Sequence, residues 1–147
     1  MTKPIEIRAA SAISAEELRL LYASVGWAAY TADIDALVAA VANSTYVVAA
    51  RADGDLVGLA RGMSDDVSIF YLQDILVQPE WQHQGVGRAL LANCLDRFSH
   101  VRQKVLLTDD LPSQHRCYEA MGYHNTRELT TVELHTFVQM GTLGLEG

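Results

Sequence analysis

Apolar residues recur three or four positions apart in four segments of this chain, a spacing that places side chains on one face of a helix. Ser14 and Glu17 form a capping-box pair before the first segment, and Gly26 ends that helix. Either Thr31 or Asp33 can cap the second helix. The sequence predicts four helices with these apolar stripes: Leu18, Leu21, Tyr22 and Val25; Ile34, Leu37, Val38 and Val41; Val86, Leu90, Leu91, Cys94, Leu95 and Phe98; Cys117, Tyr118 and Met121.

Short apolar or alternating runs between these helices predict β-strands. Asp53-Gly54 is a strong hairpin turn signal between two of the runs, and Pro79 ends a third because it cannot donate to a strand ladder. The order of the elements indicates a single α/β domain over residues 1–147, whose mixed sheet contains an antiparallel meander of three strands. The runs cover residues 5–8, 46–50, 56–60, 71–77, 104–108 and 132–137.

Composition limits the classes of function. Half of the 147 residues are hydrophobic and a fifth are charged, which is typical of a globular protein. The formal net charge of -7 argues against nucleic-acid binding, which needs a basic surface. No apolar run approaches the roughly 20 residues that span a bilayer, and the N-terminus lacks a signal-peptide pattern. We therefore expect a cytoplasmic protein that binds neither nucleic acid nor membrane.

The cysteines and histidines do not indicate redox or metal chemistry. Cys94 and Cys117 both fall in predicted helices, where free cysteines usually act as small core residues. The histidines lack the paired spacing that is typical of zinc ligands. We expect no disulfide and no metal site. The histidines are His83, His100, His115, His124 and His135.

The segment from Gln82 to Gly87 carries the most specific chemistry. It lies between the predicted strand 71–77 and the helix that begins at Val86. Gly85 and Gly87 let the backbone approach a ligand closely. The free N–H groups of the first helical turn and the positive end of the helix dipole favour an anion. The segment therefore predicts a site for a phosphate or a pyrophosphate.

Gln82, Gly85 and Gly87 also match the core motif of the GNAT superfamily of N-acetyltransferases, which is Gln or Arg, two variable residues, Gly, one variable residue, then Gly or Ala. Residues 117–123 resemble the family's late helix, in which Tyr-Glu-x-x-Gly-(Phe/Tyr) recurs, and the order of elements is similar over nearly the full chain. The resemblance implies the GNAT fold. That fold is a mixed, mostly antiparallel sheet of six or seven strands with about four helices, in which a splayed strand pair holds the cofactor. Residues 25–27, 43–44, 56–58 and 74–77 further resemble the plastid and cyanobacterial branch that acts on serotonin-like amines and protein amines.

The resemblance implies acetyl-coenzyme A as the donor. The segment Ile75-Leu76-Val77 would pair its backbone with the pantetheine arm as an extra strand, and an N–H of Leu76 or Val77 would stabilise the oxyanion. Arg88 either adds charge near the phosphates or is an ordinary exposed arginine. The motif begins at Gln82, and the backbone N–H groups implied to hold the pyrophosphate are those around His83, Gln84, Gly85, Val86, Gly87 and Arg88.

Acetyl transfer to an amine needs two proton-transfer groups. An alkyl amine with a pKa of about 10.4 is mostly protonated at neutral pH. Asp74, just before the cofactor segment, is the candidate base, although a carboxylate there can instead anchor a loop or pair with an arginine. The resemblance implies that Tyr118 protonates the leaving thiolate; a core tyrosine is the alternative. Trp27 and Tyr30, between the first two helices, are candidates for binding the acceptor or lids over the core.

One feature departs from the family pattern. Family members often carry an asparagine about two helical turns before the tyrosine, where it contacts the cofactor. Residues 109–114 contain none, so Ser113 or Gln114 would have to replace it.

These observations predict an N-acetyltransferase that moves the acetyl group to a primary amine by direct attack in a ternary complex. The amine belongs to a small molecule or to a protein. A non-catalytic acetyl-coenzyme A-binding regulator and an acyltransferase with a longer acyl donor are the alternatives. The final strand could also pair across a homodimer.

Overall fold

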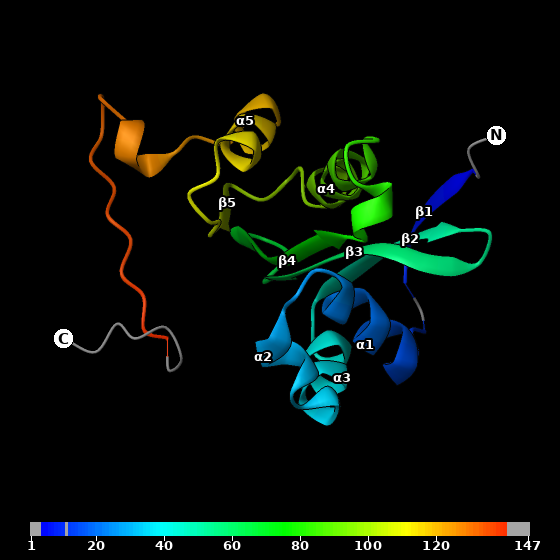
Figure 1. The fold of residues 1–147 in the computed structure, drawn as a ribbon. Helices are drawn as coiled ribbons and strands as arrows, with labels where there is room; N and C mark the ends of the chain where they lie inside the picture. The colour runs from blue at the N-terminus through cyan, green and yellow to red at the C-terminus, as the bar shows by residue number, and fades with distance from the viewer. Residues whose placement is uncertain (1–3, 11, 141–147) are drawn as a thin grey trace. The chain divides into compact units, whose positions relative to one another are not determined.

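The computed structural model describes residues 4–10 and 12–140, and the chain separates into two compact units, residues 1–107 and 108–147 (Figure 1). The prediction of a single domain over residues 1–147 stays a prediction. The second unit carries α5 (Pro112–Ala120) and the 3-10 turn η2 (Thr126–Glu128). The first unit carries β1 (Ile5–Ala9), α1 (Ala15–Ser24), α2 (Ala28–Thr31), α3 (Ile34–Ala42), β2 (Tyr46–Ala52), β3 (Asp55–Ser64), β4 (Ile69–Val77), the 3-10 turn η1 (Pro79–Trp81), α4 (Val86–Arg97) and β5 (Gln103–Leu106).

The sheet of the first unit has the order β1-β2-β3-β4-β5. The first four strands pair antiparallel, and β5 pairs parallel to β4. A parallel pair needs a crossover connection, and α4 lies between these two strands in the chain. The predicted mixed and mostly antiparallel sheet is confirmed.

The predicted number of strands is wrong, because the described residues form five strands rather than six or seven. The alternating run 132–137 was expected to be the last strand, but it adopts no strand in the structure. Alternation gives a segment two distinct faces, but a strand also needs a neighbouring strand to bond its backbone. Val132, Leu134 and Phe137 are exposed. Pairing of this segment across a homodimer stays a prediction.

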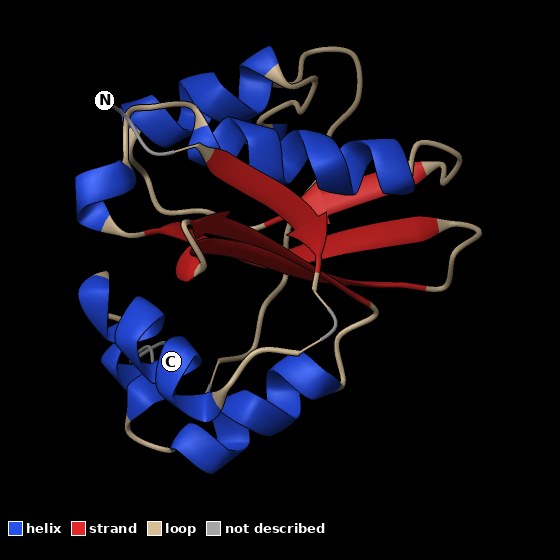
Figure 2. Cartoon of the chain, turned by 90° about the vertical axis from the view of Figure 1, so that its right-hand side faces the viewer, coloured by secondary structure: helices blue, strands red, loops and turns tan. Residues whose placement is uncertain are grey.

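Helices cover both faces of the sheet in the first unit (Figures 1 and 2). α4 packs against β2, β3 and β4 on one face, where Leu90 approaches to 3.1 Å from the position that a Cβ at Gly58 would take. Within the described residues, no helix is long and apolar enough to cross a membrane. α1 and α3 cover the other face, with a core that includes Leu18, Leu21, Tyr22, Leu37, Leu59 and Leu76.

The local signals for caps and turns are confirmed. Ser14 and Glu17 form both hydrogen bonds of the capping box at the start of α1. Asp33, rather than Thr31, caps α3 by accepting a hydrogen bond from the backbone of that helix. Asp53 and Gly54 both have positive φ, 53° and 87°, as a two-residue hairpin turn of type I′ requires.

An irregularity in β4 lies beside the candidate site. Arg61 of β3 is opposite Asp74, but the next residue, Gly62, is opposite Leu72. Gln73 is therefore an extra residue without a partner in β3. Such a bulge bends the strand and redirects the side chains that follow it.

The bulge changes which face of the sheet the β4 side chains reach. Before it, Phe70 stacks on Phe98, just after α4, with ring centroids 4.5 Å apart. After it, Asp74 bonds Tyr22 of α1, and Leu76 joins the core beneath α1 and α3. Without the extra residue, strict alternation would direct Asp74 toward the α4 side. The bulge therefore places the candidate base on the α1–α3 face.

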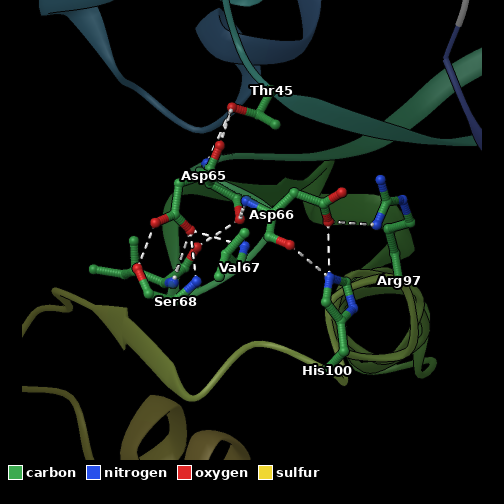
Figure 3. A network of polar contacts seen from close by, with 9 residues as sticks. Thr45, Asp65, Asp66, Val67, Ser68, Arg97 and His100 are labelled. Atoms are coloured by element: carbon green, nitrogen blue, oxygen red, sulfur yellow. Dashed lines mark hydrogen bonds and ion pairs between the residues drawn. The ribbon is translucent and has the colours of Figure 1, made fainter.

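The turn between β3 and β4 is fixed by two neighbouring aspartates (Figure 3). Asp65 accepts hydrogen bonds from the backbone of residues 67–69 and from the Ser68 hydroxyl. Asp66 pairs with Arg97 at 3.1 Å and with His100 at 2.8 Å. This end of the hairpin is therefore bound to the C-terminal end of α4.

Candidate active site

The start of α4 has no side-chain cap. α1 and α3 begin with Ser14 and Asp33, whose side chains bond the helix backbone, whereas the N-cap of α4 is Gly85. The first backbone hydrogen bond into α4 runs from Ala89 N–H to the Gly85 carbonyl. The N–H groups of residues 86–88 thus stay available at the positive end of the helix dipole.

The two loop glycines have different structural roles. Gly85 has a φ of +85°, which L side chains rarely adopt, so glycine is needed there for the backbone conformation. A Cβ at Gly87 would meet only a Val77 methyl at 3.8 Å, an ordinary contact. Packing does not require glycine at this position, where its bare backbone leaves room for a ligand. His83 also has a positive φ of 63°, and alternating backbone conformations of this kind can turn N–H groups toward a common anion.

β4 and β5 separate at the bulge. Within the described residues, β5 pairs with β4 only over Ile69–Leu72. Gln73–Val77 remain in β4, and Asp74–Val77 stay paired with β3, so the other edge of this segment is open. The structure thus contains the splayed strand pair that the resemblance implied.

The orientation of the β4 backbone along this open edge follows from two hydrogen bonds. Gln78 N–H donates to the carbonyl of Val57 in β3 at 2.8 Å. Successive residues of a strand point their polar groups to opposite sides, so the groups of Val77 and Ile75 point away from β3. The Val77 carbonyl accepts a hydrogen bond from Gln82 Nε2 at 2.9 Å, in agreement with this orientation. Of the two candidate oxyanion donors, Val77 therefore faces the open edge, and Leu76 faces β3.

The predicted donor-site residues thus lie on three consecutive parts of the chain: the second half of β4, the glycine loop and the first turn of α4. Gln82 binds the loop to the last residue of β4. Arg88 is exposed on the first turn of α4, as either of its two predicted roles allows. The open β4 edge and the uncapped α4 terminus lie in one unit, joined by a short segment, η1 and the glycine loop.

Asp74 is buried and paired with an arginine. Its carboxylate is 3% exposed, and Arg61 Nε lies 2.7 Å from Oδ2. The Tyr22 hydroxyl also donates to Oδ2, at 2.9 Å, and the Tyr30 hydroxyl donates to Oδ1 at 2.8 Å. The arginine pairing considered as an alternative for Asp74 is present, together with two tyrosine donors.

Tyr30 of α2 contacts this carboxylate, and Trp27 lies beside Tyr30. The two rings lie 6.1 Å apart, and Tyr22 contacts Tyr30 edge-on at 5.0 Å. The Arg61 guanidinium lies 5.8 Å from the centre of the Tyr30 ring. Of the two predicted acceptor-binding residues, Tyr30 therefore contacts Asp74 directly, whereas Trp27 contacts the rings of Tyr22 and Tyr30. Both also pack against the core of the α1–α3 layer.

Burial and charge set the protonation of the groups around Asp74. Burial raises the pKa of Tyr22, and the Asp74 carboxylate raises it further. Burial opposes the charge on Arg61, but Asp74 outweighs it and the pKa of the guanidinium is raised. Burial, and then Asp74, also raise the pKa of Tyr71. Tyr22 and Arg61 thus remain proton donors to Asp74 across the neutral range.

Sequence reasoning missed Tyr22, Arg61 and Gln73 as parts of this cluster. Tyr22 was assigned to the apolar stripe of its helix, which is correct for its ring but not for its hydroxyl. Arg61 directly follows the apolar run 56–60, and a charged residue that continues a buried strand is a signal for a buried partner. Gln73 offered no signal, because a bulge depends on the neighbouring strand.

Tyr118 belongs to the second unit. It lies in α5 and is half-buried, with the Tyr123 ring 6.1 Å away. Burial raises its pKa, so the hydroxyl stays protonated above the usual tyrosine range of about 10. Of the two candidate replacements for the missing asparagine, Gln114 accepts a hydrogen bond from the Thr108 hydroxyl at 2.7 Å, and Ser113 is exposed.

Cys94 does not suit covalent chemistry, and the described residues contain no cluster of metal ligands. Cys94 is fully buried, and burial raises its pKa to about 12, so it is a poor nucleophile. No three histidines, cysteines or carboxylates gather into a metal-binding group among the described residues.

A family model for the acetyltransferase (GNAT) domain matches residues 9–143. The "Putative acetyltransferase" of Gibberella zeae is 36% identical over 77 residues, which cover 49% of this chain. The chain matches only 41% of the length of this relative.

Solved structures have a similar fold. A GNAT-family acetyltransferase from Streptococcus pneumoniae aligns with a TM-score of 0.74 and 26% identity, covering 90% of this chain and 98% of that one. An aminoglycoside N-acetyltransferase in complex with coenzyme A aligns with a TM-score of 0.64 and 18% identity, covering 96% and 97% of the two chains. The family model matches most of the chain, β4 and β5 are splayed, and the N-cap residue of α4 is a glycine. This chain belongs to the GNAT family of acetyltransferases.

Proposed function

We propose that this protein transfers the acetyl group of acetyl-coenzyme A to a primary amine by direct attack in a ternary complex. The observation that carries the proposal is the open edge of β4 beside the uncapped start of α4. This arrangement offers an extended backbone for an amide-containing arm and free N–H groups for a pyrophosphate. Acetyl-coenzyme A contains both an amide-containing arm and a pyrophosphate.

The donor would bind along this path. The pyrophosphate would rest on the N–H groups of residues 83–88, and the amides of the pantetheine arm would pair with Ile75 and Val77. The N–H of Val77 faces the open edge by strand alternation. It is therefore our candidate for stabilising the oxyanion that forms when the amine adds to the thioester carbonyl.

The acceptor would bind on the α1–α3 face, beside Trp27 and Tyr30. A protonated amine must lose a proton before its nitrogen can attack, and Asp74 is the carboxylate next to the open edge. Tyr118 would protonate the thiolate as the carbon–sulfur bond breaks, a role carried by its match to the family motif and supported by its raised pKa.

The acceptor class is supported by the small-molecule amine of one structural neighbour, the aminoglycoside N-acetyltransferase. The sequence resemblance adds serotonin-like amines and protein amines. We therefore propose a small-molecule or protein amine, and the acceptor panel should contain an arylalkylamine, a polyamine, an aminoglycoside and a peptide with a free lysine.

Calorimetric titration with acetyl-coenzyme A, followed by thiol release with this panel, tests the function. We expect binding and amine-dependent thiol release. Binding without release from any amine would favour a non-catalytic regulator that binds acetyl-coenzyme A. Faster release from a longer acyl-coenzyme A would identify a different acyl donor. Absence of binding would contradict the donor site itself.

A further inference from the structure

The Tyr30 hydroxyl is the centre of the polar cluster on the α1–α3 face. It donates to Asp74 Oδ1 at 2.8 Å and accepts from Arg61 Nη2 at 3.3 Å and from Gln73 Nε2 at 3.4 Å. A hydroxyl has one proton to donate and two lone pairs to accept with. The hydrogen-bonding capacity of Tyr30 is therefore filled, and any further donor must replace one of the two amide or guanidinium groups.

Gln73 is the replaceable donor. Its contact with Tyr30 is the longest of the three, its side chain is exposed, and it occupies the bulge where β4 and β5 separate. Arg61, in contrast, is buried and is also held by Asp74 and by the Ser44 hydroxyl. A cationic amine that arrives at the open edge would therefore displace Gln73 and not Arg61.

Asp74 is not open to direct contact. Its Oδ2 accepts from both Tyr22 and Arg61, and Tyr30 covers Oδ1. An acceptor can reach the charge of this carboxylate only through the Tyr30 hydroxyl.

Building on the proposed function, we infer that the acceptor amine takes the place of Gln73 on the Tyr30 hydroxyl and loses its proton through it. The ammonium proton passes to Tyr30 Oη while the Tyr30 proton passes to Asp74 Oδ1. The neutral nitrogen then attacks the thioester carbonyl, so that a carbon–nitrogen bond forms and the carbon–sulfur bond breaks. The sulfur leaves with the bonding electrons and takes the proton of Tyr118. The nitrogen gives its second proton to solvent water, from which Tyr118 is reprotonated, and Asp74 returns its proton to solvent. Tyr30 is thus the catalytic residue in contact with the substrate, and Arg61 is a positioning residue.

The cluster offers a matched pair of variants. Tyr30→Phe and Tyr22→Phe each remove one hydroxyl that donates to Asp74, but Tyr22 is fully buried in the core and cannot contact an acceptor. We expect kcat for thiol release to fall about 100-fold in Tyr30→Phe, within the usual range for general-base catalysis. In Tyr22→Phe we expect a clearly smaller loss of kcat, because this hydroxyl bonds Asp74 but carries no proton from the acceptor. Thermal unfolding would confirm that both variants fold.

The dependence of rate on pH separates a proton relay from a structural role. The titratable groups that face Tyr30 are Arg61 from β3, and Tyr71 and Asp74 from β4, with Tyr22 from α1. Without the relay, only amine already neutral in solution can react. The rate of Tyr30→Phe should then rise about tenfold per pH unit toward the amine pKa of about 10.4. The wild-type protein and Tyr22→Phe should show a weaker rise over the same range.

Gln73→Ala completes the test. Since Gln73 only occupies the acceptor's position, its removal should keep kcat and leave KM for the amine equal or lower. Equal losses of kcat in Tyr30→Phe and Tyr22→Phe, or a loss in Gln73→Ala as large as that in Tyr30→Phe, would overturn the relay. A wild-type protein that binds acetyl-coenzyme A but acetylates no amine would instead refute the proposed function, and the relay with it.

Discussion

Gly85 and Gly54 share an unusual backbone conformation but have different surroundings. Their φ angles are +85° and +87°, and a Cβ added at either would meet no atom within 4 Å. Gly54 closes the hairpin between β2 and β3, whereas Gly85 begins α4 beside the open edge of β4. Substitutions at the two positions should therefore cause the same backbone strain, but only the substitution at Gly85 should also affect a ligand site.

Gly85→Ala and Gly54→Ala should each lower the free energy of unfolding by about 1–2 kcal/mol, because an L-residue is strained at positive φ. Only Gly85→Ala should also weaken the binding of acetyl-coenzyme A, by about tenfold or more, since its Cβ separates the phosphate from the backbone amides. Chemical denaturation and calorimetric titration measure the two effects. Equal affinities in the two variants would contradict the pyrophosphate assignment.

Tyr118→Phe should lower kcat by about 10- to 100-fold with little change in the affinity for acetyl-coenzyme A, because it removes only the proton for the thiolate. Since burial raises the pKa of Tyr118, the wild-type rate should not fall through deprotonation of this group until the pH is above about 10. Steady-state kinetics over pH check both statements. Tyr123→Phe, in the same unit, is the control, and normal turnover in Tyr118→Phe would exclude its role.

At the scale of elements, β4 has a different environment at each end. Its first half pairs with strands on both sides, and its second half pairs only with β3. The bulge at Gln73 lies between the halves, next to Asp74. The extra residue thus lies where the sheet edge opens, and it directs the carboxylate toward α1 and α2. The opposite end of the β3–β4 hairpin is held by Asp65 and Asp66 (Figure 3).

This turn should make stability depend on pH in the acid range. Hydrogen bonds from Ser68 and the neighbouring backbone lower the pKa of Asp65, and Arg97 and then His100 lower that of Asp66. A carboxylate with a lowered folded-state pKa stabilises the protein above its unfolded value of about 3.9 and loses this effect as the pH falls through the folded value.

Asp65→Asn should therefore be less stable than the wild type at neutral pH, and the difference should shrink below about pH 4. Thermal unfolding across this range measures it. Asp53→Asn is the control, because Asn-Gly is as favourable as Asp-Gly in the hairpin turn. A difference that stays constant from neutral to acid pH would show that the charge of Asp65 is not what fixes the turn.

At the scale of the whole molecule, the net charge of -7 would act on both of the proposed substrates. A negative protein attracts a cationic amine and repels the phosphates of acetyl-coenzyme A over distances that salt shortens from about 10 Å at 0.1 M to about 3 Å at 1 M. Inside the Asp74 cluster, by contrast, Arg61 balances the carboxylate. Long-range attraction of the amine must therefore come from the surface.

Rising salt should weaken the use of the proposed amine but not the use of acetyl-coenzyme A. As NaCl rises from about 0.02 to 0.5 M, kcat/KM for the amine should fall while KM for acetyl-coenzyme A falls or stays equal. Steady-state kinetics with each substrate varied in turn measure this. A parallel rise or fall of kcat/KM for both substrates would show that the net charge does not steer them.

The sequence by itself predicted those features whose interactions lie within a few residues. The capping box at Ser14 and Glu17, the turn at Asp53-Gly54 and the glycine loop before α4 depend on local backbone geometry. The order of elements followed from apolar periodicity, so a mixed sheet with an antiparallel meander of three strands could be predicted as well. That the sheet is mostly antiparallel was implied by the family resemblance.

Only the tertiary structure decided which groups contact Asp74. Arg61, Tyr30 and Tyr22 are separated from it by 13, 44 and 52 positions in the chain. Neither the bulge at Gln73 nor the absence of a strand at 132–137 can be derived from alternation, because both depend on whether a neighbouring strand supplies hydrogen-bond partners. A period of two shows that a segment has two faces; the strands beside it decide whether it pairs and which face turns inward.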